Sequence, residues 1–164
     1  MTIRFGILTL SDRCVRGERT DASGPALADL VRAQSWSVIK QALLPDDESA
    51  IRAELTAWAD SGEVDIILTT GGTGFSPRDV TPEATRAIIQ REASGLAEAM
   101  RSASLAKTSH AMLSRSVAGI RGQTLIINLP GSPKGALENL QVVIPVLGHA
   151  IQLLKEDPSS ESGH

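Results

Sequence analysis

Apolar and polar positions along the chain follow two periods, one typical of strands and the other of helices. Continuous or alternating apolar runs predict strands over 3–10, 37–44 and 64–69. Polar residues follow these runs and lead into stretches with helical spacing; the helices predicted in this way cover 25–34, 46–59, 81–91 and 95–105. Thr81 is the expected cap of the third helix, because threonine before proline is typical of a helix start. Strands that alternate with helices indicate an α/β fold, a three-layer, mostly parallel open sheet with helices on both faces.

Later parts of the chain depart from this alternation. Two further strands are predicted over 113–120 and 124–129, and Arg121 and Gly122 make a plausible turn between them. Such a pair would add an antiparallel hairpin to the open sheet.

The C-terminal part is expected to be helical. A rigid loop over 130–133 precedes two helical segments, which we expect to break near Pro145 because proline cannot donate a helical hydrogen bond. The pattern therefore predicts a single domain over 1–155 and a flexible C-terminal tail over 156–164.

Composition narrows the class of protein. A chain of 164 residues with 41% hydrophobic content can build one core, and a net charge of −3 with 2% aromatic residues argues against a nucleic-acid surface. No apolar run is read as long enough to span a bilayer, and the single Cys14 excludes an internal disulfide. We expect a soluble, cytoplasmic protein without nucleic-acid or membrane partners.

A glycine-rich turn follows the third predicted strand and holds Gly71, Gly72, Thr73 and Gly74. Closely spaced glycines let the backbone approach a ligand and point N–H groups at a phosphate. Asp79 follows, and a carboxylate beside a phosphate is repulsive unless a cation lies between them, so the pairing predicts a magnesium-bound nucleotide or another phosphorylated ligand. The spacing matches neither common phosphate-loop motif, and a plain turn with a solvated Asp79 remains the alternative.

Polar residues also follow the other predicted strands. Ligands of open parallel sheets bind beyond the carboxyl ends of the strands, where this sequence places Ser11 and Asp12, Asp46, Asn128, and the loop of Pro130, Gly131, Ser132 and Pro133. Together they predict a shared phosphate-binding rim. Three of these residues also have a local explanation: Asp46 could cap the helix that begins there, Asp12 could close a turn, and Asn128 could bond loop backbone.

Other chemistries fit poorly. The three histidines lack metal-ligand spacing, Cys14 has no identifiable activating neighbour, and the chain contains no G-x-S-x-G elbow. The segment 109–116 offers hydroxyls and the guanidinium of Arg115, which could hold a phosphate or a polar ring or form a solvated strand end.

The segment TTGGTGFSPRDVTPEAT, residues 69–85, resembles the signature of the molybdopterin adenylyltransferase family. This family includes stand-alone bacterial proteins of the MogA and MoaB type and the N-terminal domain of gephyrin. Further segments resemble the family in the same order, at 11–13, 44–47, 111–116 with 118–122, and 129–133. The resemblance extends to about Lys155.

The resemblance implies a molybdopterin-binding type of domain that transfers AMP from ATP to molybdopterin and releases pyrophosphate. Asp46 and Asp79 match the two family carboxylates essential for adenylation, and we assign them to magnesium and nucleotide positioning. The nucleotide phosphates would meet Gly71, Gly72, Thr73, Gly74, Ser11 and Asp12, and molybdopterin would meet Ser104, Ser114, Arg115, Asn128, Pro130, Gly131, Ser132 and Pro133.

The family is typically trimeric, and a molybdenum-insertion enzyme is the expected downstream partner. One alternative is a non-catalytic molybdopterin-binding or carrier protein of the same family, against which the presence of both Asp46 and Asp79 argues. Another is a role in molybdenum insertion itself, which would be expected of a longer, multidomain chain.

Overall fold

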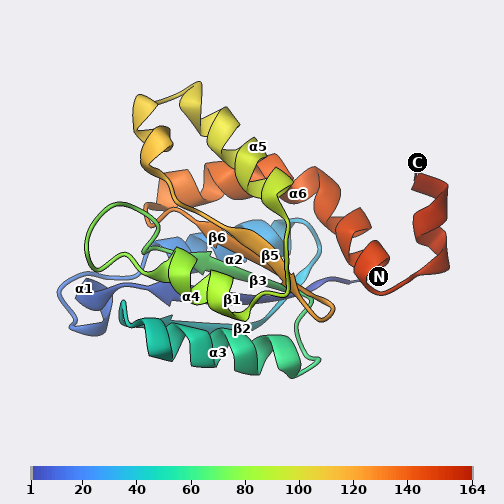
Figure 1. The fold of residues 1–164 in the computed structure, drawn as a ribbon, viewed down its shortest axis with the longest axis horizontal. Coiled ribbons are helices and arrows are strands. Elements are labelled where there is room, and N and C mark those ends of the chain that lie inside the picture. Colours follow the sequence, from blue (N-terminus) through green and yellow to red (C-terminus); the bar gives the residue numbers. More distant parts are fainter. Residues whose placement is uncertain (1, 164) are drawn as a thin grey trace.

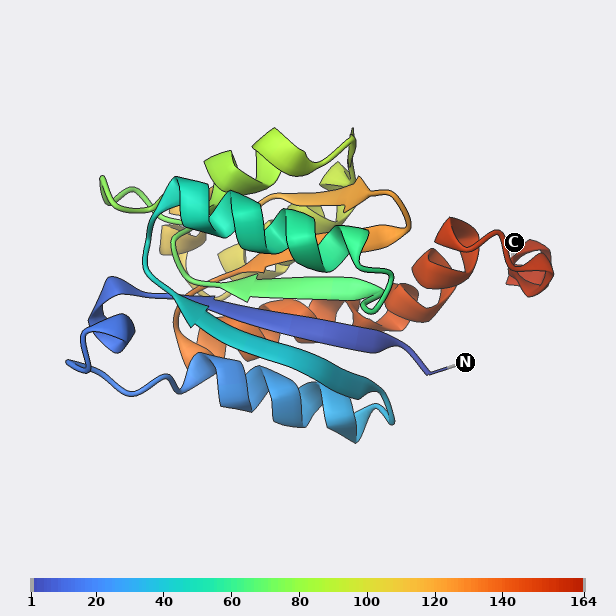
Figure 2. The ribbon, with the colours of Figure 1, turned by 90° about the horizontal axis from the view of Figure 1, so that it is seen from below.

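A computed structural model describes residues 2–163, and six strands in this range form one sheet in the order β2-β1-β3-β6-β5-β4 (Figures 1 and 2). The strands are β1 (Arg4–Leu10), β2 (Ser37–Leu44), β3 (Ile66–Thr70), β4 (Arg91–Glu92), β5 (Ala118–Arg121) and β6 (Thr124–Leu129). The helices are α1 (Asp12–Val15), α2 (Ser23–Ala33), α3 (Glu48–Asp60), α4 (Thr81–Ile88), α5 (Ser94–Leu105) and α6 (Pro133–Leu154), with 3-10 helices η1 (Ser109–Leu113) and η2 (Pro158–Gly163).

The sheet is mixed, as the sequence predicts. Strands β2, β1, β3 and β6 run parallel, whereas β5 and β4 pair antiparallel at one edge. Helices α2, α5 and α6 cover one face of the sheet, and α3 and α4 cover the other (Figures 1 and 2). The three-layer α/β fold with an antiparallel hairpin is confirmed.

Alternation along the central strands builds both layers of the core. In β1, Phe5 and Ile7 point toward α2 and α6, whereas Leu8 and Leu10 point toward α3 and α4. All four side chains are buried, because successive residues of a strand face opposite sides of a sheet that is covered on both. Because these strands are parallel, their carboxyl ends lie on the same side of the sheet.

Helix α6 corrects the expectation of a break near Pro145. A proline inside a helix removes one hydrogen bond, at a cost of about 3 kcal/mol. Pro145 lies on the exposed side of α6, while Leu140, Val143, Leu147 and Ile151 anchor both halves of the helix in the core. Tertiary packing therefore carries one helix through the proline.

The length of α6 also corrects the view that no apolar run could span a bilayer. Among the described residues, α6 alone is long and apolar enough to do so by length and composition. Part of that apolar character belongs to its core-facing side, which packs in the same cluster as β1, β3 and β6.

The start of α4 differs from the sequence interpretation of Thr81 as a helix cap. Val80 occupies the cap position without a side-chain bond, and Thr81 is the first helical residue. The Thr81 N–H donates to the Gly72 carbonyl oxygen at 3.1 Å, and its hydroxyl donates to the Gly71 carbonyl oxygen at 2.9 Å. The Thr81 side chain therefore stabilises the glycine turn and does not cap the helix.

Helix α4 ends at Ile88, three residues earlier than predicted. Ile89 is extended, and the Gln90 N–H donates to the Ile120 carbonyl oxygen. Arg91 and Glu92 then pair with β5 as the short strand β4. Residues 90–92, which the apolar pattern assigned to the helix, are therefore bonded to β5 instead.

The strand predicted over 113–120 begins only at Ala118. Before it, η1 ends at Leu113, and the Arg115 N–H donates to the Thr73 carbonyl oxygen, outside the sheet. The Val117 N–H donates to the side-chain oxygen of Asn128, and the Val117 carbonyl oxygen accepts the backbone N–H of the same residue. At the C-terminus, residues 158–163 form η2, which lies against α6.

Candidate active site

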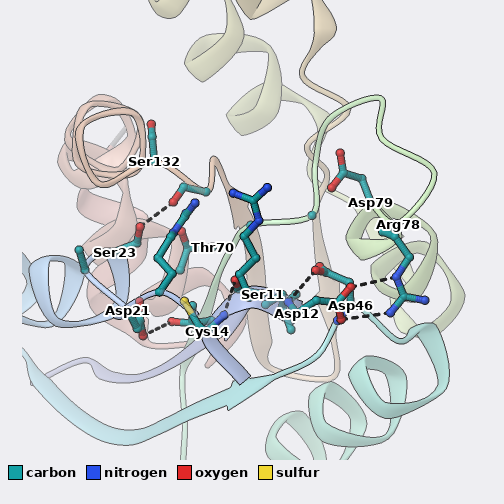
Figure 3. A pocket seen from close by; sticks show the side chains of 18 of the residues that line it. Ser11, Asp12, Cys14, Asp21, Ser23, Asp46, Thr70, Arg78, Asp79 and Ser132 are labelled. Atoms are coloured by element: carbon teal, nitrogen blue, oxygen red, sulfur yellow. Dashed lines mark hydrogen bonds and ion pairs between the residues drawn. The ribbon is translucent and has the colours of Figure 1, made fainter. Parts of the chain in front are cut away.

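A cavity of about 780 Å³ opens at the carboxyl ends of the parallel strands (Figure 3). The structure brings to it residues from four separate loops of the predicted rim. They are Ser11 and Asp12 after β1, Asp46 after β2, Gly71, Gly72 and Asp79 after β3, and Gly131, Ser132 and Pro133 after β6. We call it the large cavity.

The glycine turn is shaped by the strand beside it. Gly71 and Gly72 have φ angles of +104° and +68°, a region that residues with a side chain rarely adopt. A Cβ on Gly71 would lie 2.3 Å from the Leu10 carbonyl oxygen, and one on Gly72 would lie 2.3 Å from the Thr81 hydroxyl oxygen. Glycine is therefore required at both positions, which leaves the inner surface of the turn open to a ligand.

Three charged residues form a connected group on one side of the large cavity (Figure 3). Asp12 accepts two hydrogen bonds from Arg78, at 2.9 and 3.1 Å. Asp12 and Asp46 exchange backbone N–H bonds to each other's carboxylates, at 3.0 and 3.1 Å. The Arg78 bonds hold the pKa of Asp12 below its ordinary value, whereas burial raises the pKa of Asp46.

Asp46 is not the cap of α3. The cap is Asp47, whose carboxylate accepts the Ala50 N–H at 2.9 Å. Asp46 Oδ2 accepts from Asp12, but Asp46 Oδ1 is buried and has no hydrogen-bond partner among the described residues. One oxygen of the carboxylate, Oδ1, is therefore free for another role.

A divalent cation fits the side chains at this point. Burial raises the pKa of Asp46 most, and the negative charges of Asp12 and then Asp79 raise it further, so the carboxylates of Asp46 and Asp79 repel each other. A cation between them would relieve this repulsion and satisfy Asp46 Oδ1. Among the described residues no cluster of three metal-binding side chains occurs, so other ligands would have to come from phosphate oxygens and water, as Mg²⁺ prefers.

A second cavity, of about 330 Å³, lies on the other side of the Pro130 loop. Ser104, Ser114, Pro130 and Ser132 of the predicted pterin site line it, and we call it the small cavity. The glycine turn reaches both cavities: Gly71 and Gly72 line the large one, and Thr73 and Gly74 line the small one. Ser132 lines both.

The loop between the cavities is held from two sides. The Ser23 hydroxyl donates to the Gly131 carbonyl oxygen at 2.6 Å (Figure 3). The Thr70 hydroxyl donates to the Pro130 carbonyl oxygen at 2.7 Å. Ser132 caps α6 by accepting the Gly135 N–H. These contacts fix Ser132 at the junction of the two cavities.

Arg115 and Asn128 line neither cavity. Arg115 donates to the carbonyl oxygens of Gly74 and Asp79, both at 2.8 Å, and to the Glu83 carboxylate. It braces the loop that carries Asp79.

Asn128 lies on β6 with no exposed surface. Its side-chain amide donates to the hydroxyls of Thr69 and Thr85, and its carbonyl oxygen accepts the Val117 N–H. Internal bonds use the whole side chain, and the bond from the Val117 N–H is the backbone contact that the sequence left open as an alternative for this residue.

Several cavity residues were not predicted from the sequence. The large cavity also takes in Arg16 and Arg19, and the small one takes in Arg101 and Asn139. Arg13 and Arg78, which also line the large cavity, lie in predicted strand-end segments but were given no role. Three arginines at a spacing of three directly after a strand were a readable signal for a phosphate site. Arg101 and Asn139 lie on helices far from the motifs, and no local pattern distinguishes them.

The open sheet with a two-part pocket at its carboxyl edge defines a ligand-binding α/β domain. A family model described as "Probable molybdopterin binding domain" matches residues 6–149, and the chain belongs to this family.

Individual relatives agree with that assignment. The chain is 44% identical to the molybdenum cofactor synthesis protein cinnamon of Drosophila melanogaster over 96% of its own length, but spans only 26% of that relative. It is 40% identical to the molybdopterin adenylyltransferase of Escherichia coli, covering 92% of this chain and 78% of that one.

Solved structures are similar over nearly the whole chain. MoaB from Thermus thermophilus superposes with a TM-score of 0.90 at 52% identity, covering 96% of this chain and 99% of that one. A structure of MogA superposes with a TM-score of 0.87 at 39% identity, covering 92% and 99%.

Proposed function

We propose that the protein is a molybdopterin adenylyltransferase, which transfers AMP from ATP to molybdopterin in molybdenum cofactor biosynthesis. The observation that carries the proposal is the shared wall of the two cavities, where the glycine turn and Ser132 face both. Two phosphorylated substrates bound on either side would bring their phosphates together at this wall. Relatives named molybdopterin adenylyltransferase support the same reaction.

The large cavity would take ATP, and the small cavity would take molybdopterin. An oxygen of the molybdopterin phosphate attacks the α-phosphorus of ATP and forms a new P–O bond. The bond from the α-phosphorus to the bridging oxygen breaks, and pyrophosphate leaves with the electron pair. The protein supplies no covalent nucleophile, so its contribution is positioning and charge neutralisation.

The chain's own groups can do this work. Backbone N–H groups of the glycine turn would hold phosphate oxygens, and Ser104 and Ser114 would hold the pterin substrate. Asp46 and Asp79 would hold Mg²⁺, which when bound neutralises phosphate charge as the transition state forms. The buried Oδ1 of Asp46 supports this assignment.

The test is incubation of the pure protein with molybdopterin, ATP and magnesium, followed by detection of adenylated molybdopterin and pyrophosphate. Asp79→Asn is the matched variant, because the Asp79 carbonyl oxygen keeps its bond from Arg115 and an amide oxygen can still accept the Ser76 N–H. We expect it to bind molybdopterin normally and to lose adenylation by at least about 100-fold. Binding of molybdopterin without adenylation by the parent protein would instead identify a carrier.

Family resemblance extends the proposal to assembly and context. We expect a homotrimer in the cytoplasm that passes its product to a molybdenum-insertion enzyme. Exposed Val142, Val146 and Leu153 on α6 offer apolar surface for self-association. Light scattering coupled to size exclusion would measure the mass of the assembly.

A further inference from the structure

The segment between α1 and α2 brings three arginines to the large cavity. Arg13, Arg16 and Arg19 all line it, although none belongs to the glycine turn or to the carboxylate pair. All three side chains are exposed. Any role for them toward a nucleotide rests on the proposed use of this cavity by ATP.

Two of the three arginines are available to a ligand. Arg16 is held by Glu18 through two hydrogen bonds, at 2.9 and 3.2 Å. The side chains of Arg13 and Arg19 make no hydrogen bond or ion pair with any residue that the structure describes, and Arg13 reaches Glu18 only as a distant charge that lowers its pKa. Arg78, the remaining arginine of the cavity, is already paired with Asp12.

The segment that carries these arginines is fastened at both ends. At its start, the Ser11 N–H donates to the Leu44 carbonyl oxygen, and the Ser11 hydroxyl accepts the Cys14 N–H. At its end, Asp21 accepts hydrogen bonds from the buried Thr9 hydroxyl and from the Gly24 N–H, at 2.8 and 3.0 Å. The anchors keep the backbone beside the cavity while the arginines stay exposed.

The proposed reaction leaves one need unmet by the groups already assigned. The glycine turn and the two carboxylates face the reacting phosphates, but the departing pyrophosphate carries several negative charges of its own. Arginine binds such oxygens through paired hydrogen bonds. We infer that Arg13 and Arg19 bind the β- and γ-phosphates of ATP and the pyrophosphate that leaves, so that the segment 13–19 distinguishes a nucleoside triphosphate from a monophosphate.

Calorimetry on the purified protein tests this with ATP, AMP and inorganic pyrophosphate as separate ligands in magnesium buffer. Each of Arg13→Gln and Arg19→Gln should weaken binding of ATP and pyrophosphate by about tenfold, and the double variant should weaken it by about 100-fold. Binding of AMP should change by less than about twofold. Pyrophosphate should also inhibit adenylation less strongly in the double variant.

Arg32→Gln is the matched control, because Arg32 is an exposed arginine of α2 that does not line the cavity. It removes the same charge and should leave all three affinities unchanged. The inference is overturned if the double variant binds ATP and pyrophosphate like the parent, if AMP binding falls equally, or if the parent binds neither ATP nor pyrophosphate. Pyrophosphate binding that depends on both arginines upholds it even where no molybdopterin is adenylated, which separates it from the proposed function.

Discussion

Asp12 and Asp46 hold each other by a reciprocal pair of hydrogen bonds, in which each backbone N–H donates to the carboxylate of the other residue. The pair joins the loop after β1 to the loop after β2. One oxygen of Asp46 is used in this way, and the other remains buried without a partner among the described residues. The arrangement separates the structural use of Asp46 from its proposed chemical use.

Asp46→Asn should therefore abolish adenylation without loss of stability. The amide oxygen can still accept the Asp12 N–H, but a neutral group holds magnesium poorly, so we expect a rate loss of at least about 100-fold. Burial raises the pKa of Asp46, so its charge lowers stability above that pKa, and this cost disappears as the pH falls below it. Thermal unfolding at pH 7.5 without magnesium should show an equal or higher Tm for the variant.

Asp47→Ala is the opposite change at the neighbouring position. It removes the cap of α3 and should lower the free energy of unfolding by about 1 kcal/mol while adenylation persists.

Full adenylation by Asp46→Asn at saturating magnesium would refute the two-carboxylate model and leave Asp47 or Asp12 to be tested.

Gly72→Ala should destabilise the fold as well as the site. The φ of +68° is strained for alanine, and the added Cβ would lie 2.3 Å from the Thr81 hydroxyl oxygen, which is buried and bonded to Gly71. We expect a loss of roughly 2–4 kcal/mol, measured by urea unfolding. Gly62→Ala has a φ of +73° but meets nothing within 4 Å, so it should cost only about 1 kcal/mol. Equal losses would show that the Thr81 contact is unimportant.

Much of the fold could be predicted because its determinants are local. The parallel strands are continuous or, in β2, alternating apolar runs, and the strand predicted over 37–44 matches β2 at both ends. Where prediction failed, a contact distant in sequence decided the structure. Pro145 stays helical because α6 is anchored in the core on both sides of it. Thr81 does not cap α4, because its hydroxyl donates to the Gly71 carbonyl oxygen.

The site followed the same rule. Residues directly after strands were predictable, because the carboxyl ends of parallel strands meet at one edge. The role of Arg115 was not, because its partners Gly74, Asp79 and Glu83 lie 32 to 41 positions away. Asn128 was predicted to lie on the rim. Strand alternation instead points its side chain toward α4, where its amide donates to the Thr85 hydroxyl.

Arg115→Lys should impair the site because one ammonium cannot replace the guanidinium fork. Arg115 joins Gly74 and Asp79 through separate nitrogens, so lysine would release part of the loop between them. We expect a KM for ATP raised about tenfold and a stability loss of about 1–2 kcal/mol. Glu83→Gln leaves both backbone bonds in place and should have the smaller effect on KM. A larger effect of Glu83→Gln would assign the role to the ion pair instead.

Asp65→Asn should destabilise the protein without affecting adenylation. Asp65 precedes β3 at the amino ends of the parallel strands, opposite the cavities. It is 2% exposed and pairs with Arg4 and Lys155. Its removal leaves two cations without their partner, for which we expect a loss of about 2–3 kcal/mol, because both cations are partly exposed. Asp60→Asn breaks an exposed pair with Arg121, which solvent screens, and should cost much less stability than Asp65→Asn.

The pH dependence of Asp65→Asn gives a second readout. Burial acts to raise the pKa of Asp65, but the hydrogen bonds from Arg4 and Lys155 outweigh it and hold the pKa below its ordinary value. A lowered carboxyl pKa contributes stability that is present above the unfolded pKa and is lost as the pH falls through the folded one. The difference in unfolding free energy between parent and variant should therefore be constant near neutrality and shrink below about pH 4. If the difference in unfolding free energy stays constant down to pH 3, packing and not the charge of Asp65 stabilises this end of the sheet.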